Sequence, residues 1–255
     1  MGRSGKASAG ALASNRAQSA PRSLIGIGFL RPGRLAGFGR LSHHAGENQG
    51  GSAMVDELRL YTLRPGAMAR YLDLAARVAA PVRGDRYGTL LGFWSNEVGA
   101  ANAVVNLWRH ATLETRKALR RELEALPAWR EQYLPGVRPL MLRQVVRFLD
   151  PVLPLAAPAT PGPHWYEQRL FQTRPGEAGA LAEALVRAAE PGQIAVWTSF
   201  AGPINEVVQL LAHGDLPARL ARGLHGPDGA LARHADRIQE VETCLMRPAP
   251  HSPLR

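Results

Sequence analysis

The stretch ELRLYTLRPG at residues 57–66 occurs a second time as EQRLFQTRPG at residues 167–176. The two copies share Glu, Arg, Leu, Arg, Pro and Gly at matching positions, and Tyr61 of the first copy is replaced by Phe171 in the second. An internal repeat indicates that one structural unit is present more than once in a chain. The two halves should therefore contain the same elements in the same order.

A helical segment follows each Arg-Pro-Gly sequence. It covers residues 67–80 in the first half and residues 177–190 in the second, with apolar residues at helical spacing. The proline and glycine before each segment favour a turn. Because proline lacks an amide hydrogen and clashes with the preceding turn of a helix, Pro81 and Pro191 predict the ends of the two helices.

Two strands follow in each half, and their residues match closely. The segments are residues 89–99 and 102–110 in the first half, and residues 193–202 and 205–213 in the second. The offset between the copies falls from 110 to 103 residues at this point. The second copy therefore lacks seven residues that the first copy has near residues 81–89.

A second helix and a closing strand complete each half. Thr112 and Asp215 are predicted to cap the second helices, because a side-chain oxygen there accepts a hydrogen bond from the first helical turn. The closing strands are predicted at residues 140–149 and 241–248. Each half thus reads strand, helix, strand, strand, helix, strand, which is the ferredoxin-like arrangement.

The predicted fold class is α+β, with two ferredoxin-like (βαββαβ) units that pair their sheets inside one chain as a dimeric α/β-barrel. The helices are expected to cover the outside of this barrel. The predicted domains are residues 54–150 and 164–255, joined by a Pro- and Ala-rich linker at residues 151–163. The chain would then contain its own dimer partner, and association into a homo-oligomer is left open.

The first 53 residues differ from the rest of the chain. They are rich in Gly, Ser, Ala and Arg, which predicts a disordered basic tail at residues 1–53. This composition is typical of an organellar transit peptide; alternatively, Met54 is the natural start. Seven basic residues and one acidic residue give this segment +6 of the net charge of +10. The nearly balanced remainder argues against a nucleic-acid partner, and no apolar run approaches the ~20 residues that a membrane span needs.

Polar and aromatic side chains alternate with aliphatic ones along the predicted strands. Because successive side chains of a strand point to opposite faces, the two kinds occupy different faces of the sheet. The aliphatic face is expected to pack on the helices, which directs the polar face into the lumen between the sheets. Alternatively, the polar groups are structural and satisfy one another, as buried polar groups require. The candidate ligand-binding residues of the lumen are Glu57, Arg59, Tyr61, Asn102, Asn106, Trp108, His110, Arg169, Asn205, Gln209 and His213.

The sequence contains no recognisable catalytic or metal-binding motif. A Gly-x-Ser-x-Gly elbow, a Walker loop and a Gly-x-Gly-x-x-Gly fingerprint are all missing. The one cysteine, Cys244, excludes an internal disulfide and is expected to be a small core residue. His110 and His213 have no second ligand at a metal-binding spacing. No catalytic residue, metal or cofactor is therefore predicted.

Residues 54–255 resemble two copies of the domain of the NIPSNAP family. The resemblance is carried by ELRLYTLRPG, GFWSNEVGAANAVVNLWRH, TRKALRRELEALPAWREQY and the C-terminal RPAPHSPLR. It is stronger in the first copy, because the second lacks a tryptophan corresponding to Trp129. The family commonly has a histidine at the position of Asn106, so a ligand contact made by that histidine would be altered here.

The resemblance implies a dimeric α/β-barrel but no established reaction. Eukaryotic members of the family are mitochondrial and are linked to organelle quality control and vesicle traffic, whereas the Arg-rich, Lys-poor composition here is closer to the bacterial members. The first hypothesis is a non-catalytic cytoplasmic module that binds a small molecule or a protein. The second is a cofactor-free monooxygenase-like barrel enzyme, and the third is a mitochondrial adaptor addressed by residues 1–53.

Overall fold

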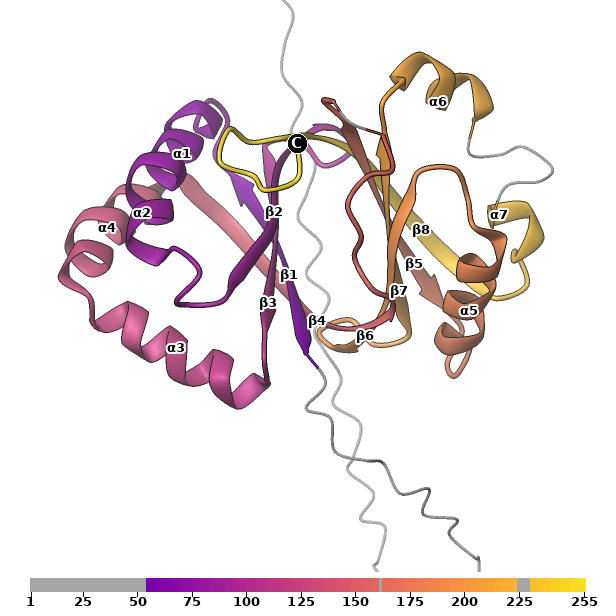
Figure 1. Ribbon diagram of the computed structural model, residues 1–255, viewed down its shortest axis with the longest axis horizontal. Coiled ribbons are helices and arrows are strands. Elements are labelled where there is room, and N and C mark those ends of the chain that lie inside the picture. Colours follow the sequence, from indigo (N-terminus) through magenta and orange to yellow (C-terminus); the bar gives the residue numbers. More distant parts are fainter. Residues whose placement is uncertain (1–53, 161, 224–229) are drawn as a thin grey trace, which may run out of the picture. The chain divides into compact units, whose positions relative to one another are not determined.

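The computed structural model describes residues 54–160, 162–223 and 230–255. The tail or transit peptide predicted at residues 1–53 lies outside the described residues. Within them, eight strands form one closed antiparallel barrel (Figure 1). The strands are β1 (Val55–Leu63), β2 (Thr89–Val98), β3 (Ala103–His110), β4 (Met141–Leu153), β5 (Trp165–Thr173), β6 (Gln193–Ala201), β7 (Glu206–His213) and β8 (Ile238–Pro248).

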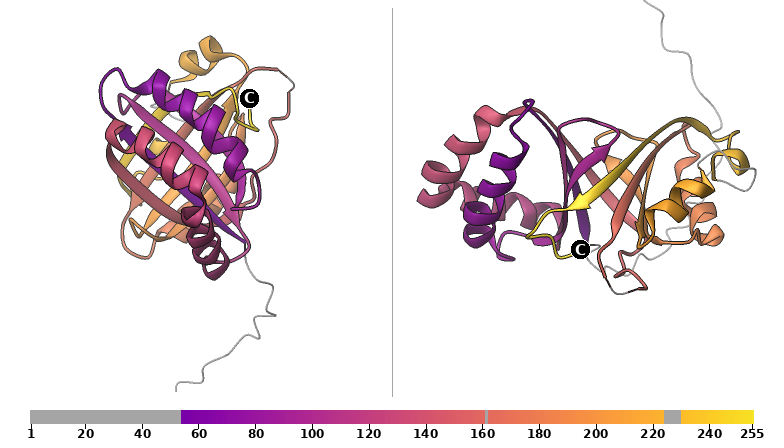
Figure 2. Two further views of the ribbon diagram at one scale, coloured as in Figure 1. Left: turned by 90° about the vertical axis from the view of Figure 1, so that its left-hand side faces the viewer. Right: turned by 90° about the horizontal axis from the view of Figure 1, so that it is seen from above.

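The helices gather in two groups on opposite sides of the barrel (Figures 1 and 2). Thr112 and Asp215 cap α3 (Leu113–Ala125) and α6 (Leu216–Arg222) as predicted, because their side chains accept hydrogen bonds from the amides of Thr115 and Ala218. The first group is α1 (Met68–Leu74), the π-helical η1 (Ala75–Ala79), α2 (Ala80–Arg83), α3 (Leu113–Ala125), the π-helical η2 (Ala128–Tyr133), α4 (Leu134–Val137) and the 3-10 turn η3 (Arg138–Leu140). The second group is α5 (Ala178–Ala188), α6 (Leu216–Arg222) and α7 (Ala230–Arg233).

The barrel consists of two four-stranded sheets that meet at two seams. The first sheet has the strand order β4-β1-β3-β2 and the second has the order β6-β7-β5-β8. Strand β2 pairs with β8, and β4 pairs with β6, so each seam joins the two halves of the chain. This topology confirms the predicted α+β class and the barrel formed within one chain. Closure also leaves neither sheet with an unpaired edge that would invite association with another strand.

Strand β4 takes part in both sheets. It pairs with β1 from Met141 to Leu149 and with β6 from Phe148 to Leu153. The strand therefore continues three residues into the segment predicted as a linker at residues 151–163. Strand β8 makes the same transition at the other seam, where it pairs first with β5 and then with β2. These two long strands connect the halves through backbone hydrogen bonds.

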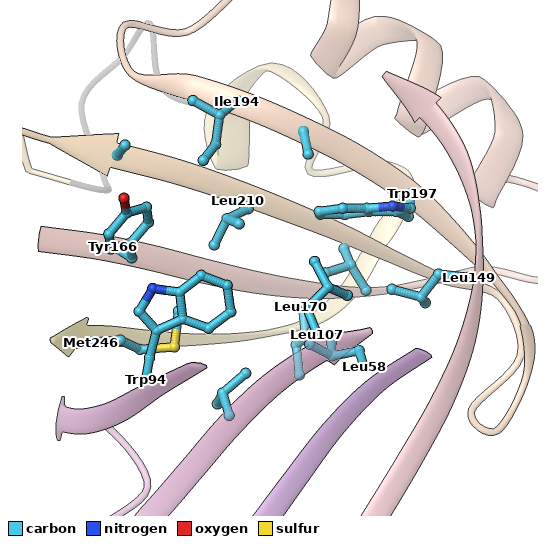
Figure 3. Packing of buried hydrophobic residues seen from close by; sticks show 14 residues of the cluster. Leu58, Trp94, Leu107, Leu149, Tyr166, Leu170, Ile194, Trp197, Leu210 and Met246 are labelled. Atoms are coloured by element: carbon cyan, nitrogen blue, oxygen red, sulfur yellow. The ribbon is translucent and has the colours of Figure 1, made fainter. Parts of the chain in front are cut away.

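An apolar core drawn from both halves fills the lumen of the barrel (Figure 3). Leu58 of β1 and Leu170 of β5 belong to this one cluster. Trp94 of β2 packs on Tyr166 of β5, with ring centroids 5.4 Å apart. The aliphatic face of the strands therefore lines the lumen, and the prediction that the polar face does so is wrong.

The polar and aromatic face of the first sheet points outward, toward the helices. Arg116 of α3 donates a hydrogen bond to Glu57, and Tyr71 of α1 makes an edge contact with Tyr61. Both faces of β1 are largely buried. The alternation of residue types therefore distinguishes the two faces of the strand but does not predict which of them lines the lumen. The strand register places Trp94 opposite Val105, so this large side chain belongs to the aliphatic face.

The first helix does not end at Pro81 as predicted. In η1 the chain makes a wider turn, in which the amide of Ala80 donates to the carbonyl of Ala75. Pro81 then lies in the first turn of α2, where the missing amide hydrogen is tolerated. In the second half, α5 ends at Ala188, before Pro191. The helix of the first half is thus longer and extends to Arg83.

Candidate functional site

A cavity of about 530 Å³ lies between the first sheet and the helices that cover it. Its walls come from β1 to β4 on one side, from the helical elements α1 to η3 on the other, and from the C-terminal residues His251 and Pro253. Small-molecule sites typically enclose ~300–1,000 Å³, so the size suits an organic ligand. The aromatic residues of the lining are Tyr61, Tyr71, Phe93, Trp108, Trp129 and Tyr133.

Four arginines from different elements line this cavity: Arg59 of β1, Arg83 of α2, Arg120 of α3 and the exposed Arg138 of η3. Arg83 donates to the carbonyl of Tyr87 at 2.9 Å, and its guanidinium carbon lies 3.2 Å from the ring centroid of Trp108. Burial, together with the charges of Arg59 and Arg120, lowers the pKa of Arg83 to about 9. The cavity therefore contains a concentration of positive charge at neutral pH.

The carboxylates of the lining are Asp85 and Glu124, and both residues are exposed. Glu124 pairs with Arg120 at 3.3 Å. By contrast, Arg59 and Arg83 are only 8% and 4% exposed. The acidic side chains thus lie toward solvent, while the buried part of the lining is cationic.

Several buried nitrogen atoms of the lining have no hydrogen-bond partner in the described part of the chain. They are Arg59 Nε, Arg83 Nε, Asn106 Nδ2 and Trp129 Nε1, which are donors, and His251 Nδ1, which donates or accepts depending on the tautomer. Buried donors normally have a partner, and leaving one without costs ~1–3 kcal/mol. A ligand with acceptor atoms would satisfy these donors.

Four of the residues predicted to bind a ligand line this one cavity: Arg59, Tyr61, Asn106 and Trp108. The indole nitrogen of Trp108 donates to the amide oxygen of Asn106 at 2.7 Å. This bond fixes both side chains and leaves the amide nitrogen of Asn106 as a free donor. The sequence thus grouped these four residues correctly, although they face the helices and not the lumen.

Glu57 and His110, also predicted as site residues, form an ion-pair network behind the cavity. The Glu57 carboxylate accepts a hydrogen bond from Arg116 at 2.5 Å and lies 3.1 Å from His110 Nε2 and 3.7 Å from Arg59 Nε. Burial alone would raise the pKa of Glu57, but the hydrogen bonds from His110 and Arg116 and the charge of Arg59 hold that pKa well below its usual range. Glu57 is therefore an ionised structural group.

The second half repeats this network around Glu167. His213 Nε2 lies 2.9 Å from the Glu167 carboxylate, and Arg219 donates two hydrogen bonds to it. As for Glu57, burial opposes ionisation, but hydrogen bonds from Arg219, His213 and Arg169 hold the pKa of Glu167 well below its usual range. His213 thus has a structural partner, as His110 has.

Arg169 and Gln209 differ from their counterparts in the first half, because both are engaged with protein groups. Arg169 pairs with Glu190 through hydrogen bonds of 2.6 and 2.9 Å and donates to Glu167 at 2.6 Å. It also donates to Gln209 at 3.2 Å. The alternative in which the polar groups satisfy one another therefore describes these residues of the second half.

Asn102 and Asn205 lie outside the cavity, in the turns that connect β2 to β3 and β6 to β7. Their φ angles are 53° and 58°, a left-handed conformation that asparagine tolerates better than most residues. Their carbonyls accept hydrogen bonds from the amides of Leu63 and Thr173. The requirements of the turns account for asparagine in both copies, so the assignment of these two residues to the lumen is corrected.

Sequence analysis missed residues that complete the cavity, above all Arg83, Arg120 and Tyr133. Arg83 lies in the segment that the first copy has and the second lacks. The change in offset signalled this insertion, and the unequal match at Trp129 signalled a difference in the second helix. That both segments close over the same sheet depends on the tertiary structure.

No group of three His, Cys, Asp or Glu side chains that could hold a metal ion occurs within residues 54–160, 162–223 and 230–255. In that same part of the chain, no helix is both long enough and apolar enough to cross a membrane.

Comparison with known proteins identifies the first half. The model of the NIPSNAP family matches residues 56–154, which include β1 through β4. NipSnap homolog 2 of Homo sapiens is 28% identical over 218 residues, which cover 78% of this chain and 74% of that protein. Residues 56–154 are therefore a NIPSNAP domain. NipSnap homolog 3A of Homo sapiens is 30% identical over 135 residues, which cover 52% of this chain and 53% of that protein, so the chain spans about half of its length.

The NIPSNAP match contains the first sheet, except for Val55, and the helices around the cavity. A monooxygenase-like protein of Fusobacterium nucleatum subsp. nucleatum has the same fold, with a TM-score of 0.59 at 9% identity. The match covers 80% of this chain and 99% of that chain. At this identity the likeness shows the fold alone, and a fold does not determine a function.

Proposed function

We propose that this protein is a binding protein whose first-half cavity takes a small organic molecule. The observation that carries the proposal is a cavity of about 530 Å³ with buried donors that lack partners in the described residues. Aromatic walls with a few convergent polar groups are the usual composition of a ligand site. The cavity supplies the apolar surface for the body of a ligand and the donors that orient it.

Binding without catalysis fits the state of the ionisable groups. General acid–base catalysis needs an acid or base within hydrogen-bond reach of the substrate. Glu57 and His110 are bonded to each other, and Glu57 is also bonded to Arg116. The lining of the cavity offers arginines, aromatic rings, an amide and the imidazole of His251, whose ring packs on Phe93, and these groups can hold and orient a ligand.

The test is a thermal-shift screen of the full chain against a library of anionic, neutral and cationic aromatic compounds. Ligands that bind only the native state raise its stability with concentration. We expect hits with wild-type protein that are lost in Ala79→Leu, because Ala79 lines the cavity and a larger side chain occupies part of its volume.

Ala118→Leu on the exposed face of α3 is the matched control and should keep every hit. Hits that bind Ala79→Leu as well as wild type would place binding elsewhere and contradict the proposal. A library without a single hit on wild type would contradict it as well.

The monooxygenase-like and mitochondrial-adaptor hypotheses remain predictions. The first rests on fold likeness, and the second rests on residues 1–53, which lie outside the described part of the chain. Oxygen consumption measured with each compound that binds would separate an enzyme from a binding protein.

A further inference from the structure

The second half shows how this fold satisfies the arginine of its first strand. The guanidinium of Arg169 is held by the carboxylate of Glu190 through two hydrogen bonds, from Nη1 at 2.6 Å and from Nη2 at 2.9 Å. Such two-point pairs between arginine and a carboxylate are strong and geometrically specific. Glu190 follows α5 and stands directly before Pro191.

The first half has the same arginine but lacks this carboxylate. Arg59 corresponds to Arg169 at the offset of 110 residues, and at the same offset Glu190 corresponds to Ala80, which stands directly before Pro81. Ala80 and Arg59 both line the cavity. In the first half, the sequence position from which the second half supplies a carboxylate is thus occupied by an alanine that lines the cavity.

Arg59 has no equivalent bond to replace the missing pair. Its Nε lies 3.7 Å from Glu57, too far for a hydrogen bond, and it has no hydrogen-bond partner in the described residues. The Glu57 carboxylate is already engaged by Arg116 and His110. The buried guanidinium thus lacks the close counter-ion that Arg169 has.

The other charged residues of the cavity add to the positive charge around Arg59. Arg83 and Arg120 share the cavity with Arg59, and the acidic residues of the lining, Asp85 and Glu124, are exposed. An anion entering the cavity would thus meet the buried guanidinium groups of Arg59 and Arg83, and electrostatic attraction is stronger at buried positions than in solvent.

From this asymmetry between the halves we infer that the ligand of the cavity is an aromatic carboxylate, whose carboxylate pairs with Arg59 as that of Glu190 pairs with Arg169. Its planar apolar body packs among Tyr61, Tyr71 and Trp129. The inference rests on the proposed function and adds the chemical class of the ligand.

The experiment compares 2-naphthoate with 2-naphthamide, which have the same shape but differ in charge. Their dissociation constants for the full chain are measured by isothermal titration calorimetry at pH 7. We expect naphthoate to bind about tenfold more tightly or better, since hydrogen bonds to charged groups are the stronger ones. Equal affinities would overturn the carboxylate inference and leave the proposed binding function standing.

Ala80→Glu supplies the missing carboxylate from the chain itself, and Ala80→Gln is its neutral control of equal size. We expect Ala80→Glu to weaken naphthoate binding about tenfold relative to Ala80→Gln, because the new side chain pairs with Arg59. Ala80→Glu should also melt at a higher temperature than Ala80→Gln. Equal affinities and equal melting temperatures of the two variants would overturn the inference.

If neither probe binds wild-type protein, the carboxylate inference is overturned. The proposed function is then judged by the library screen, whose neutral and cationic compounds do not depend on this inference.

Discussion

The Glu57 carboxylate is fully buried and is stabilised by Arg116, His110 and Arg59. Burying a charge costs several kcal/mol unless its partners are well placed. The same arrangement around Glu167 in the second half shows that the repeated Glu and Arg of ELRLYTLRPG have a structural role. At Arg59, the bidentate carboxylate partner that Arg169 has in Glu190 is missing, and the repeat leaves this arginine able to bind another anion.

Glu57→Gln should lower the free energy of unfolding by about 3 kcal/mol at pH 7, because Arg116 and Arg59 lose their buried counter-ion. Urea denaturation of wild type and variant measures the difference. Glu131→Gln is the control, since Glu131 forms an exposed pair with Arg130 and should change stability by less than about 0.5 kcal/mol. A cost of Glu57→Gln as small as that of the control would show that the network is not stabilising.

The same comparison has a defined pH dependence. The pKa of Glu57 is lower in the folded protein than its ordinary value of 4.5, so its ionised form stabilises the fold above pH 4.5. That stabilisation is lost as the pH falls below 4.5 toward the folded pKa. The stability difference between wild type and Glu57→Gln should therefore be constant from pH 7 to 6 and shrink at pH 3.

At the scale of elements, the π-helical η1 distinguishes the two halves. It allows the first helix to continue past Pro81 to Arg83, whereas α5 ends at Ala188. The continuation brings Arg83 onto the face of Trp108 and closes one side of the cavity. The two halves thus differ by a local change in helical pitch. The first half has this change and contains Arg59, whereas the second half lacks it and contains Arg169, which is paired with Glu190.

Gly92 of strand β2 lies close to the ring of Trp94, which belongs to the apolar core in the lumen of the barrel. A Cβ added to Gly92 would lie 1.9 Å from the ring of Trp94, which packs on Tyr166 of the other half. Gly92→Ala should therefore lower the free energy of unfolding by about 2 kcal/mol, as overpacked cores do. The control is Gly179→Ala on α5, where nothing lies within 4 Å and where alanine should raise stability by about 0.5–1 kcal/mol. Stability unchanged by Gly92→Ala would mean that the Trp94 ring moves freely.

At the scale of the molecule, the two halves form one core. Asp56 of β1 is fully buried; it accepts a hydrogen bond from Trp197 of β6 at 2.8 Å and pairs with Arg109 of β3. This polar contact adds to the two seams and to the apolar lumen. Either half alone would expose an apolar face that the other half covers.

The two halves should therefore stay together when the chain connecting them is cut. A protease site placed after Ala157, in the segment between β4 and β5, allows cleavage of the folded protein. We expect the two fragments to elute as one particle in size-exclusion chromatography and to separate only in denaturant, because separation exposes the lumen to water. Separation without denaturant would contradict a shared core.

The sequence by itself determined the duplication, the βαββαβ order of each half and the caps at Thr112 and Asp215, because these depend on short-range patterns and on a repeat that is visible in the letters. It also grouped Arg59, Tyr61, Asn106 and Trp108 on one face of the sheet, since residues of a strand alternate with period two. Only the tertiary structure decided that this face meets the helices. Both faces are buried, so the inner one is set by which large side chains fill the closed barrel, and the cavity is set by helices that close over the sheet from distant parts of the chain.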